Sequence, residues 1–162
     1  MEQIKRFEFV PGAEIVIAPG RTVKRIRALV AIAAFGVSPG DLGGYIEKEA
    51  QVYGNAWVSG NARVYGDAQV SGDAWVYGRG LIFWASIVGT ENGTLTVYNG
   101  KGNTLLVTRG CFSGTVDEFL TKSADTHDDR TRTEYRMLID VARSRIEHER
   151  TTIAVPAGEV AA

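Results

Sequence analysis

The sequence is poor in the residues that build metal centres and disulfide frameworks. Its 162 residues include one cysteine and two histidines. A single cysteine excludes a disulfide within the chain and a zinc site of the CxxC type, and two histidines leave little room for a histidine-rich metal centre. We therefore expect neither a metal site nor a cofactor.

The chain also has a small net charge and only short apolar runs. The formal net charge is −1, which argues against bulk attraction to nucleic acid. The most apolar stretch, residues 28–37, is shorter than the ~20 residues of a membrane-spanning helix. It follows the basic run 21–27, and we expect a buried strand pair in this region, with strand-like alternation at 14–17 and 23–26, rather than a membrane anchor. The first ten residues lack the apolar core of a secretory signal, so we expect a cytoplasmic protein.

Glycine, by contrast, is abundant and unevenly placed. The chain has 19 glycines against 4 prolines, above the usual share of about 7%. Residues 44–91 follow one six-residue frame of eight hexads, with Ile or Val at every third position and a small residue at every first position. Glycine fills the fifth position of the five clearest hexads, AQVYGN, AWVSGN, ARVYGD, AQVSGD and AWVYGR.

The hexad has a direct physical interpretation. In an extended segment the first and third positions point the same way, so both should face inward. Glycine followed by Asn or Asp supplies a corner, because these residues tolerate the left-handed backbone region. Three hexads then close a triangular coil, which predicts a short left-handed parallel β-helix over residues 44–91 that needs caps at its ends.

The flanking segments carry the signals of those caps. Alternating residues on either side of Pro19-Gly20 predict an N-terminal β-hairpin. Two strand patterns, 94–98 and 104–108, flank a glycine-rich turn, and capping boxes at Thr115 and Thr131 predict two helices separated by the linker 125–132. The expected fold is therefore mainly β, with an N-terminal hairpin cap and a C-terminal hairpin plus two helices. The predicted segments are 1–43 (β cap), 44–91 (β-helix), 92–150 (ββαα module) and 151–162 (flexible tail).

Residues 18 apart should lie above one another in such a coil, which sorts the outward side chains into three faces. We name them by their residues. The tryptophan face carries Trp57 and Trp75 with Ser59 and Tyr77, and the glutamine face carries Gln51 and Gln69 with Tyr53 and Ser71. The third face carries Tyr45, Arg63 and Leu81 with Glu47, Tyr65 and Phe83. Trp84 stands where a corner glycine is expected, so the chain should begin to leave the coil there.

Two outward tryptophans on one face need a reason, because large exposed aromatic patches are costly. A homotrimer interface is the first explanation. A docked N-terminal hairpin or C-terminal helix is the second. A ligand site is the third, with tryptophan stacked on a base or sugar and arginine on a phosphate. The candidate binding residues are Trp57, Trp75, Tyr77, Arg63, Tyr65 and Arg79.

Cys111 and His127 are the only residues that suggest a nucleophile and its base. No third orienting residue is evident, and a lone cysteine beside Phe112 is more typical of a small packed side chain. His127 with Asp128 and Asp129 is more typical of a solvated linker than of a metal site. We expect no catalytic residue and no metal ligand among them.

Three stretches together resemble a known family. They are Gly40–Glu47 (GDLGGYIE), the hexads, and Gly110–Phe119 (GCFSGTVDEF) with Thr126-His127-Asp128. This layout resembles phage and prophage hexapeptide-repeat proteins of unassigned function. The resemblance implies a phage-encoded cytoplasmic protein and transfers no catalytic residue. The chain departs from it in a short repeat array and in lacking a glycine between His127 and Asp128.

These observations favour a non-catalytic binding protein. An anti-defence role fits the resemblance, either by blocking a host defence complex or by sequestering a nucleotide signal. One alternative is a hexapeptide-type acyltransferase, but such enzymes need a general-base histidine near the coils, and no histidine precedes His127. The other alternative is a structural or assembly scaffold, for which the repeat array is short.

Overall fold

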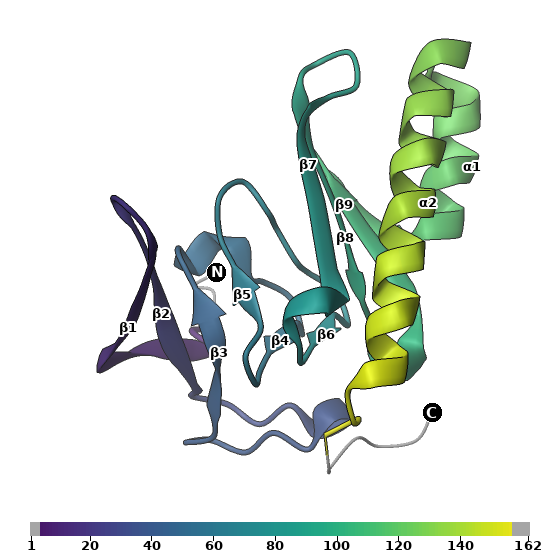
Figure 1. Ribbon diagram of the computed structural model, residues 1–162. Coiled ribbons are helices and arrows are strands. Elements are labelled where there is room, and N and C mark those ends of the chain that lie inside the picture. The colour runs from purple at the N-terminus through teal and green to yellow at the C-terminus, as the bar shows by residue number, and fades with distance from the viewer. Residues whose placement is uncertain (1–3, 157–162) are drawn as a thin grey trace.

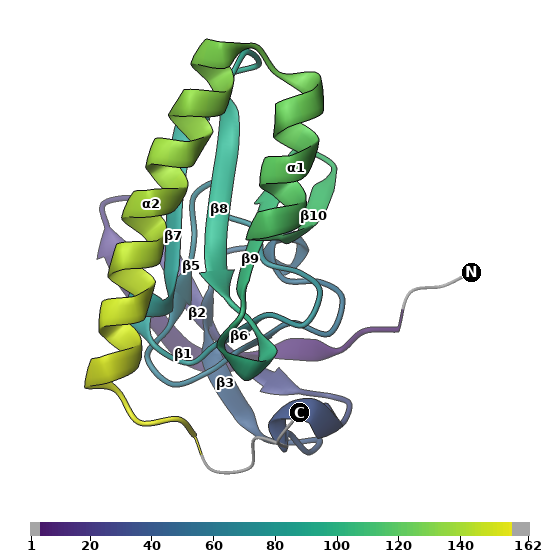
Figure 2. The ribbon, with the colours of Figure 1, turned by 90° about the vertical axis from the view of Figure 1, so that its right-hand side faces the viewer.

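A computed structural model describes residues 4–156 as a mainly β structure with two helices (Figures 1 and 2). Two four-stranded sheets have the orders β1-β2-β3-β5 and β10-β9-β8-β7, and β4 pairs with β6. No helix in residues 4–156 is both long and apolar enough to cross a membrane. The strands are β1 (Phe7–Ala18), β2 (Arg21–Ala28), β3 (Leu42–Ile46), β4 (Trp57–Val58), β5 (Arg63–Val64), β6 (Trp75–Val76), β7 (Ile82–Val88), β8 (Gly93–Asn99), β9 (Leu105–Arg109) and β10 (Phe112–Thr115), followed by the helices α1 (Val116–Thr126) and α2 (Asp129–Thr152).

The predicted N-terminal hairpin is confirmed. Strands β1 and β2 pair antiparallel, and Gly20 turns the chain with a φ of 72°. The apolar stretch 28–37 follows β2 and does not itself form a pair of strands. A 3-10 turn (Ala33–Phe35) ends at Gly36 in the left-handed conformation, so the chain reverses at once and only one bridge forms, between Ile32 and Val37.

The hexads show the predicted spacing in their central part. Parallel pairs join Tyr45 with Arg63, Val52 with Val70, and Trp57 with Trp75, each 18 residues apart. The third positions from Ile46 to Val76 are buried, as the alternation predicts. The corner glycines adopt positive φ at Gly54, Gly60, Gly66 and Gly72.

The last two hexads do not continue this arrangement. Gly78 is extended, with a φ of −160°, and makes no corner. Residues 79–81 form a 3-10 turn, and the chain then enters β7, which pairs antiparallel with β8. The repeat arrangement therefore ends before residue 91, and Trp84 lies within β7 opposite Thr96 rather than at a corner.

Two corner glycines offer a matched test of the repeat. A methyl group on Gly54 would lie 2.9 Å from the backbone nitrogen of Gly72, whereas one on Gly72 would meet nothing within 4 Å. Both substitutions place alanine at positive φ, which costs about 1–2 kcal/mol. We expect Gly54→Ala to destabilise the protein more than Gly72→Ala in urea unfolding. Equal losses would contradict the close approach of Gly54 to Gly72.

The C-terminal module contains the predicted hairpin, with β8 antiparallel to β9. Both helices pack on one face of the sheet β10-β9-β8-β7 (Figure 2). Helix α1 begins after Thr115, which caps it as predicted. The cap expected at Thr131 is wrong, because Asp128 accepts the Thr131 amide at 2.8 Å and starts α2 earlier. The tail prediction falls partly on residues 157–162, outside the described residues.

The cap of α2 gives a prediction for acidic solution. The Thr131 amide that donates to Asp128 holds the pKa of this carboxyl below its ordinary value of 3.8. A depressed folded pKa contributes stability above the ordinary value, and this contribution is lost as the pH falls through the folded pKa. We expect Asp128→Asn, which keeps the capping oxygen, to reduce the loss of stability below pH 4 in thermal unfolding. An unchanged pH profile would contradict the cap.

Candidate functional site

The tryptophan face is covered by the chain itself. Trp57 and Trp75 are only 4% and 1% exposed, and Tyr77 is also buried. The ring of Trp75 stacks on Phe35 with centroids 5.1 Å apart and planes 6° from parallel. Of the three explanations, coverage by another part of the chain holds, but the covering element beside Trp75 is the 3-10 turn before Gly36 and not the hairpin. The homotrimer loses its supporting observation and stays a prediction.

The glutamine face is covered by the second sheet only in part, because Gln51 and Ser71 are buried whereas Tyr53 and Gln69 are exposed. The backbone amide of Gln69 donates to the Thr96 hydroxyl at 3.2 Å. The Thr108 hydroxyl donates to the backbone carbonyl of Gln69 at 2.7 Å. The Ser71 amide donates to the Tyr98 hydroxyl at 3.2 Å. Burial raises the pKa of this phenol, which therefore stays a neutral hydroxyl at neutral pH. Side chains of β8 and β9 thus satisfy the backbone of this face.

The third face is partly open and carries a pocket, with Leu81 buried and Arg63 and Tyr65 half-buried. Figure 1 shows β5 between β3 on one side and β7 on the other. A cavity of about 370 Å³ lies here. Its lining residues are Arg63, Tyr65, Arg79, Ile82, Phe83 and Trp84, so three of the six predicted binding residues meet in it. We call it the third-face pocket. The other three, Trp57, Trp75 and Tyr77, lie buried on the tryptophan face.

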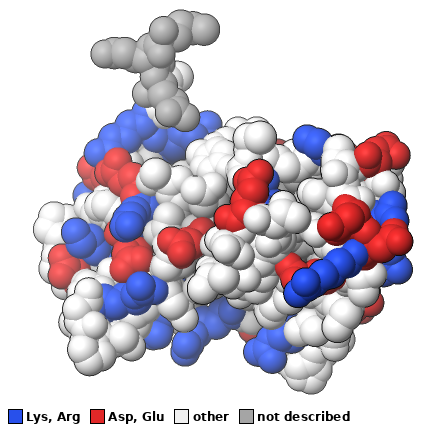
Figure 3. Space-filling model, turned by 90° about the horizontal axis from the view of Figure 1, so that it is seen from above, with Lys and Arg blue, Asp and Glu red and all other residues white. Residues whose placement is uncertain are grey.

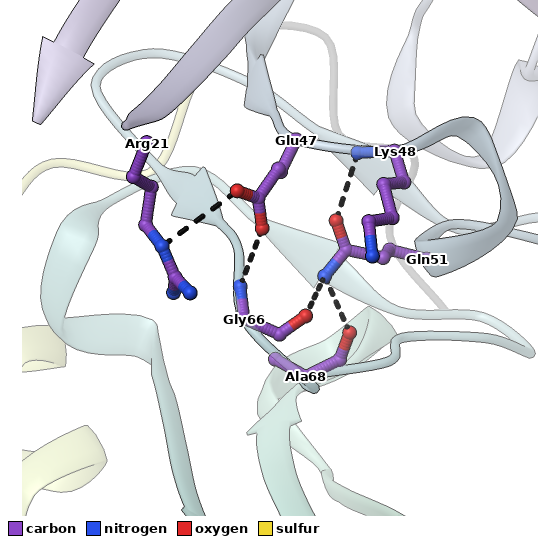
Figure 4. Close-up of polar contacts among 6 residues, drawn as sticks. All are labelled: Arg21, Glu47, Lys48, Gln51, Gly66 and Ala68. Atoms are coloured by element: carbon purple, nitrogen blue, oxygen red, sulfur yellow. Dashed lines mark hydrogen bonds and ion pairs between the residues drawn. The ribbon is translucent and has the colours of Figure 1, made fainter. Parts of the chain in front are cut away.

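Two aromatic rings meet at the wall of the third-face pocket. Tyr65 and Trp84 contact edge to face, with centroids 4.8 Å apart. The guanidinium of Arg21 lies 5.7 Å from the centre of the Tyr65 ring. This cation also pairs with Glu47 at 3.7 Å, and the other Glu47 oxygen accepts the Gly66 amide at 2.9 Å (Figure 4). The contacts of Arg21 and Glu47 hold the Tyr65 ring and the adjacent Gly66 in place.

A second set of hydrogen bonds holds the neighbouring corner. The buried amide of Gln51 donates to the carbonyls of Gly66 at 3.1 Å and Ala68 at 3.0 Å, and its oxygen accepts the Lys48 amide at 2.9 Å (Figure 4). Residues 66–68 are therefore pinned from two sides. The pocket wall is rigid where Tyr65 leaves β5.

The pocket is basic. Arg63 is half-buried and Arg79 is exposed, and within residues 4–156 neither guanidinium has an ion pair or a hydrogen bond. The nearby Glu149 carboxylate is engaged, because it accepts the Gly80 amide at 2.7 Å. Elsewhere, charges of both signs are interspersed over the face seen from above (Figure 3). Two available guanidinium groups beside aromatic rings suit an anionic ligand.

Sequence reasoning did not assign Arg21 and Trp84 to this site. Trp84 follows Gly66 by 18 residues, and a methyl group on Gly66 would lie 3.6 Å from its indole nitrogen. The 18-residue offset was thus a usable signal for Trp84. Arg21 comes from the N-terminal hairpin, and no repeat pattern relates it to Tyr65.

The other candidate residues lie apart from the pocket. Cys111 is exposed between β9 and β10. His127 accepts or donates a hydrogen bond at 2.7 Å with the Ser123 hydroxyl and packs against Tyr135, at the junction of the two helices. Among the described residues no three His, Cys, Asp or Glu side chains cluster closely enough to hold a metal ion.

Comparison with known proteins relates the chain to a repeat class only. Residues 50–66 and 56–72 match the model of the YdcK beta solenoid repeat. No curated protein and no solved structure matches the chain. The matched residues contain both members of the Val52–Val70 pair and include Arg63 and Tyr65 of the third-face pocket, so the chain is similar to beta-solenoid repeat proteins in this segment.

Proposed function

We propose that the chain is a non-catalytic binding protein that captures an anionic partner in the third-face pocket. The resemblance to phage hexapeptide-repeat proteins supports a phage-encoded accessory protein in the host cytoplasm, acting against host defence. The partner is then a component of that defence, either a protein or a nucleotide signal. We further propose that the hexads form a short left-handed parallel β-helix, which the 18-residue pairing supports.

One observation carries the binding proposal. The third face presents Arg63 and Arg79 in one pocket with Tyr65 and Trp84, and neither guanidinium has an ion pair among the described residues. Arg63 is half-buried, and a half-buried guanidinium without a partner costs free energy that the counter-charge of a ligand would offset.

The alternatives have less support. An acyltransferase of the hexapeptide type would need a general base at the coils. Both histidines lie outside them, with His127 following α1 and His148 within α2. A scaffold role would use the repeat as a spacer, and only three parallel pairings extend it. Turnover of acetyl-CoA by the purified protein would revive the enzyme.

The double substitution Arg63→Ala with Arg79→Ala tests the proposal. We expect calorimetric titration with anionic probes, namely mono- and dinucleotides and an acidic peptide, to show at least one ligand. The double variant should bind that ligand at least about tenfold more weakly, because it loses two charge-assisted hydrogen bonds.

The matched control replaces two exposed arginines of α2, Arg136 and Arg145, with alanine. This variant has the same net charge as the pocket variant and leaves the pocket intact. It should bind like the unmodified protein. Equal weakening in both variants would show a general charge effect and would refute a site at the third face.

A further inference from the structure

The parallel pairs of the hexads leave three backbone edges facing the position of the next coil. Two of them are capped by polar groups from the second sheet. The edge at residues 69–71 meets Thr96, Thr108 and Tyr98. The edge at β6 is capped where the Asn99 side-chain amide donates to the Trp75 carbonyl at 3.0 Å and the Lys101 amide donates to the Asp73 carbonyl at 2.9 Å.

The third edge, on β5, has no such cap. The amides of Tyr45 and Glu47 donate to the carbonyls of Ala62 and Val64. Because peptide groups along a strand point alternately to its two sides, the N–H and C=O of Arg63 and the N–H of Tyr65 point away from β3. Within residues 4–156 these three groups have no hydrogen-bond partner.

These unpaired groups lie at the third-face pocket, since Arg63 and Tyr65 line it. Phe83 and Trp84 of β7 also line it, and Trp84 contacts Tyr65 edge to face. Strand β7 pairs with β8 along its other side, so it has diverged from β5 where a further coil would have closed the gap. An unpaired strand edge is a template for another extended chain.

We propose that the partner is a protein and that it docks as an extended acidic segment, adding a strand to the free edge of β5. This rests on the proposed function and names the class of partner. The segment hydrogen-bonds the free groups of Arg63 and Tyr65 through its backbone. Its outward acidic side chains meet the guanidinium groups of Arg63 and Arg79, which lie on the same open face. A nucleotide would match the arginines and the rings but would leave this row of strand-forming backbone groups without a strand.

The probe is an eight-residue peptide that alternates glutamate with threonine, blocked at both ends. Two further peptides carry N-methyl groups, one on every glutamate nitrogen and the other on every threonine nitrogen. All three have the same charge, and each methylated peptide lacks the N–H donors of one edge only. Calorimetric titration measures their affinities. Amide hydrogen exchange followed by NMR reports on Arg63 and Tyr65.

We expect the parent peptide to bind and to slow the exchange of the Arg63 and Tyr65 amides. One methylated peptide should bind at least about tenfold more weakly than the other, because only one of its edges faces β5. The Arg63→Ala, Arg79→Ala variant should weaken all three. Equal binding of both methylated peptides would mean docking by charge alone and would overturn strand addition.

Other outcomes separate this inference from the proposed function. If nucleotides bind and the parent peptide does not, the third face is a binding site but strand addition is wrong. If peptide binding leaves the exchange of Arg63 and Tyr65 unchanged while protecting amides elsewhere, the edge is misassigned. If no anionic probe binds, both proposals fail.

Discussion

Replacing Trp75 with alanine is expected to lower the free energy of unfolding by about 3–5 kcal/mol. The side chain is 1% exposed, packs against Phe35 and Tyr77, and pairs in register with Trp57. Its removal opens a cavity between the hexads and the N-terminal segment, which cannot collapse because both sides are held by backbone pairing. Urea unfolding followed by circular dichroism measures the loss.

Two comparisons make this result informative. Trp84→Ala removes an indole that is only half-buried, so it should cost less stability than Trp75→Ala. The effect of Trp75→Ala should also be independent of protein concentration, since the ring is covered within one chain. A small loss accompanied by dissociation of an oligomer in analytical ultracentrifugation would instead return Trp75 to a subunit interface.

The burial of Trp75 shows what a repeat pattern can and cannot predict. Alternation fixes which side of the strand a side chain takes, and the inward positions Val58, Val64 and Val70 are buried as expected. It says nothing about whether the outward side is later covered. Phe35 comes from a segment with no repeat relation to Trp75, so only the tertiary fold brings the two rings together.

The sequence pattern does not show where the repeat ends, for a related reason. Ile82 and Val88 keep the hexad frame, but an alternating pattern is shared by a coil of short strands and by one continuous strand. The decisive residue is Gly78, which sits in a corner position yet is extended. A methyl group there would lie 2.5 Å from the end of the Ile153 side chain, so this glycine packs against the chain after α2 instead of making a turn.

The candidate site was predicted in part. Arg63, Tyr65 and Arg79 were assigned from the hexads and do share a pocket. The stacking residues that were expected to accompany them, Trp57 and Trp75, are buried on another face. The aromatic wall comes instead from Trp84 on β7, because the parallel pairing of the hexads ends before this residue and β7 brings it against Tyr65.

Replacing Asn99 with alanine is expected to lower the free energy of unfolding by roughly 3 kcal/mol. The Asn99 side chain is fully buried. Its amide nitrogen donates to the Trp75 carbonyl at 3.0 Å, and its oxygen accepts the Arg150 side chain at 2.9 Å. Alanine would leave both the carbonyl and the guanidinium without these partners. Urea unfolding measures the change in the free energy of unfolding.

Asn99→Asp separates the two contacts. An aspartate keeps an oxygen for Arg150 and gains its charge, but it cannot donate to the Trp75 carbonyl. If the cap on β6 dominates, Asn99→Asp should lose nearly as much stability as Asn99→Ala. If the link to α2 dominates, the aspartate should recover most of the loss. A loss below about 0.5 kcal/mol in both variants would mean that the carbonyl of Trp75 finds water, and that this edge of the repeat is as open as the edge at β5.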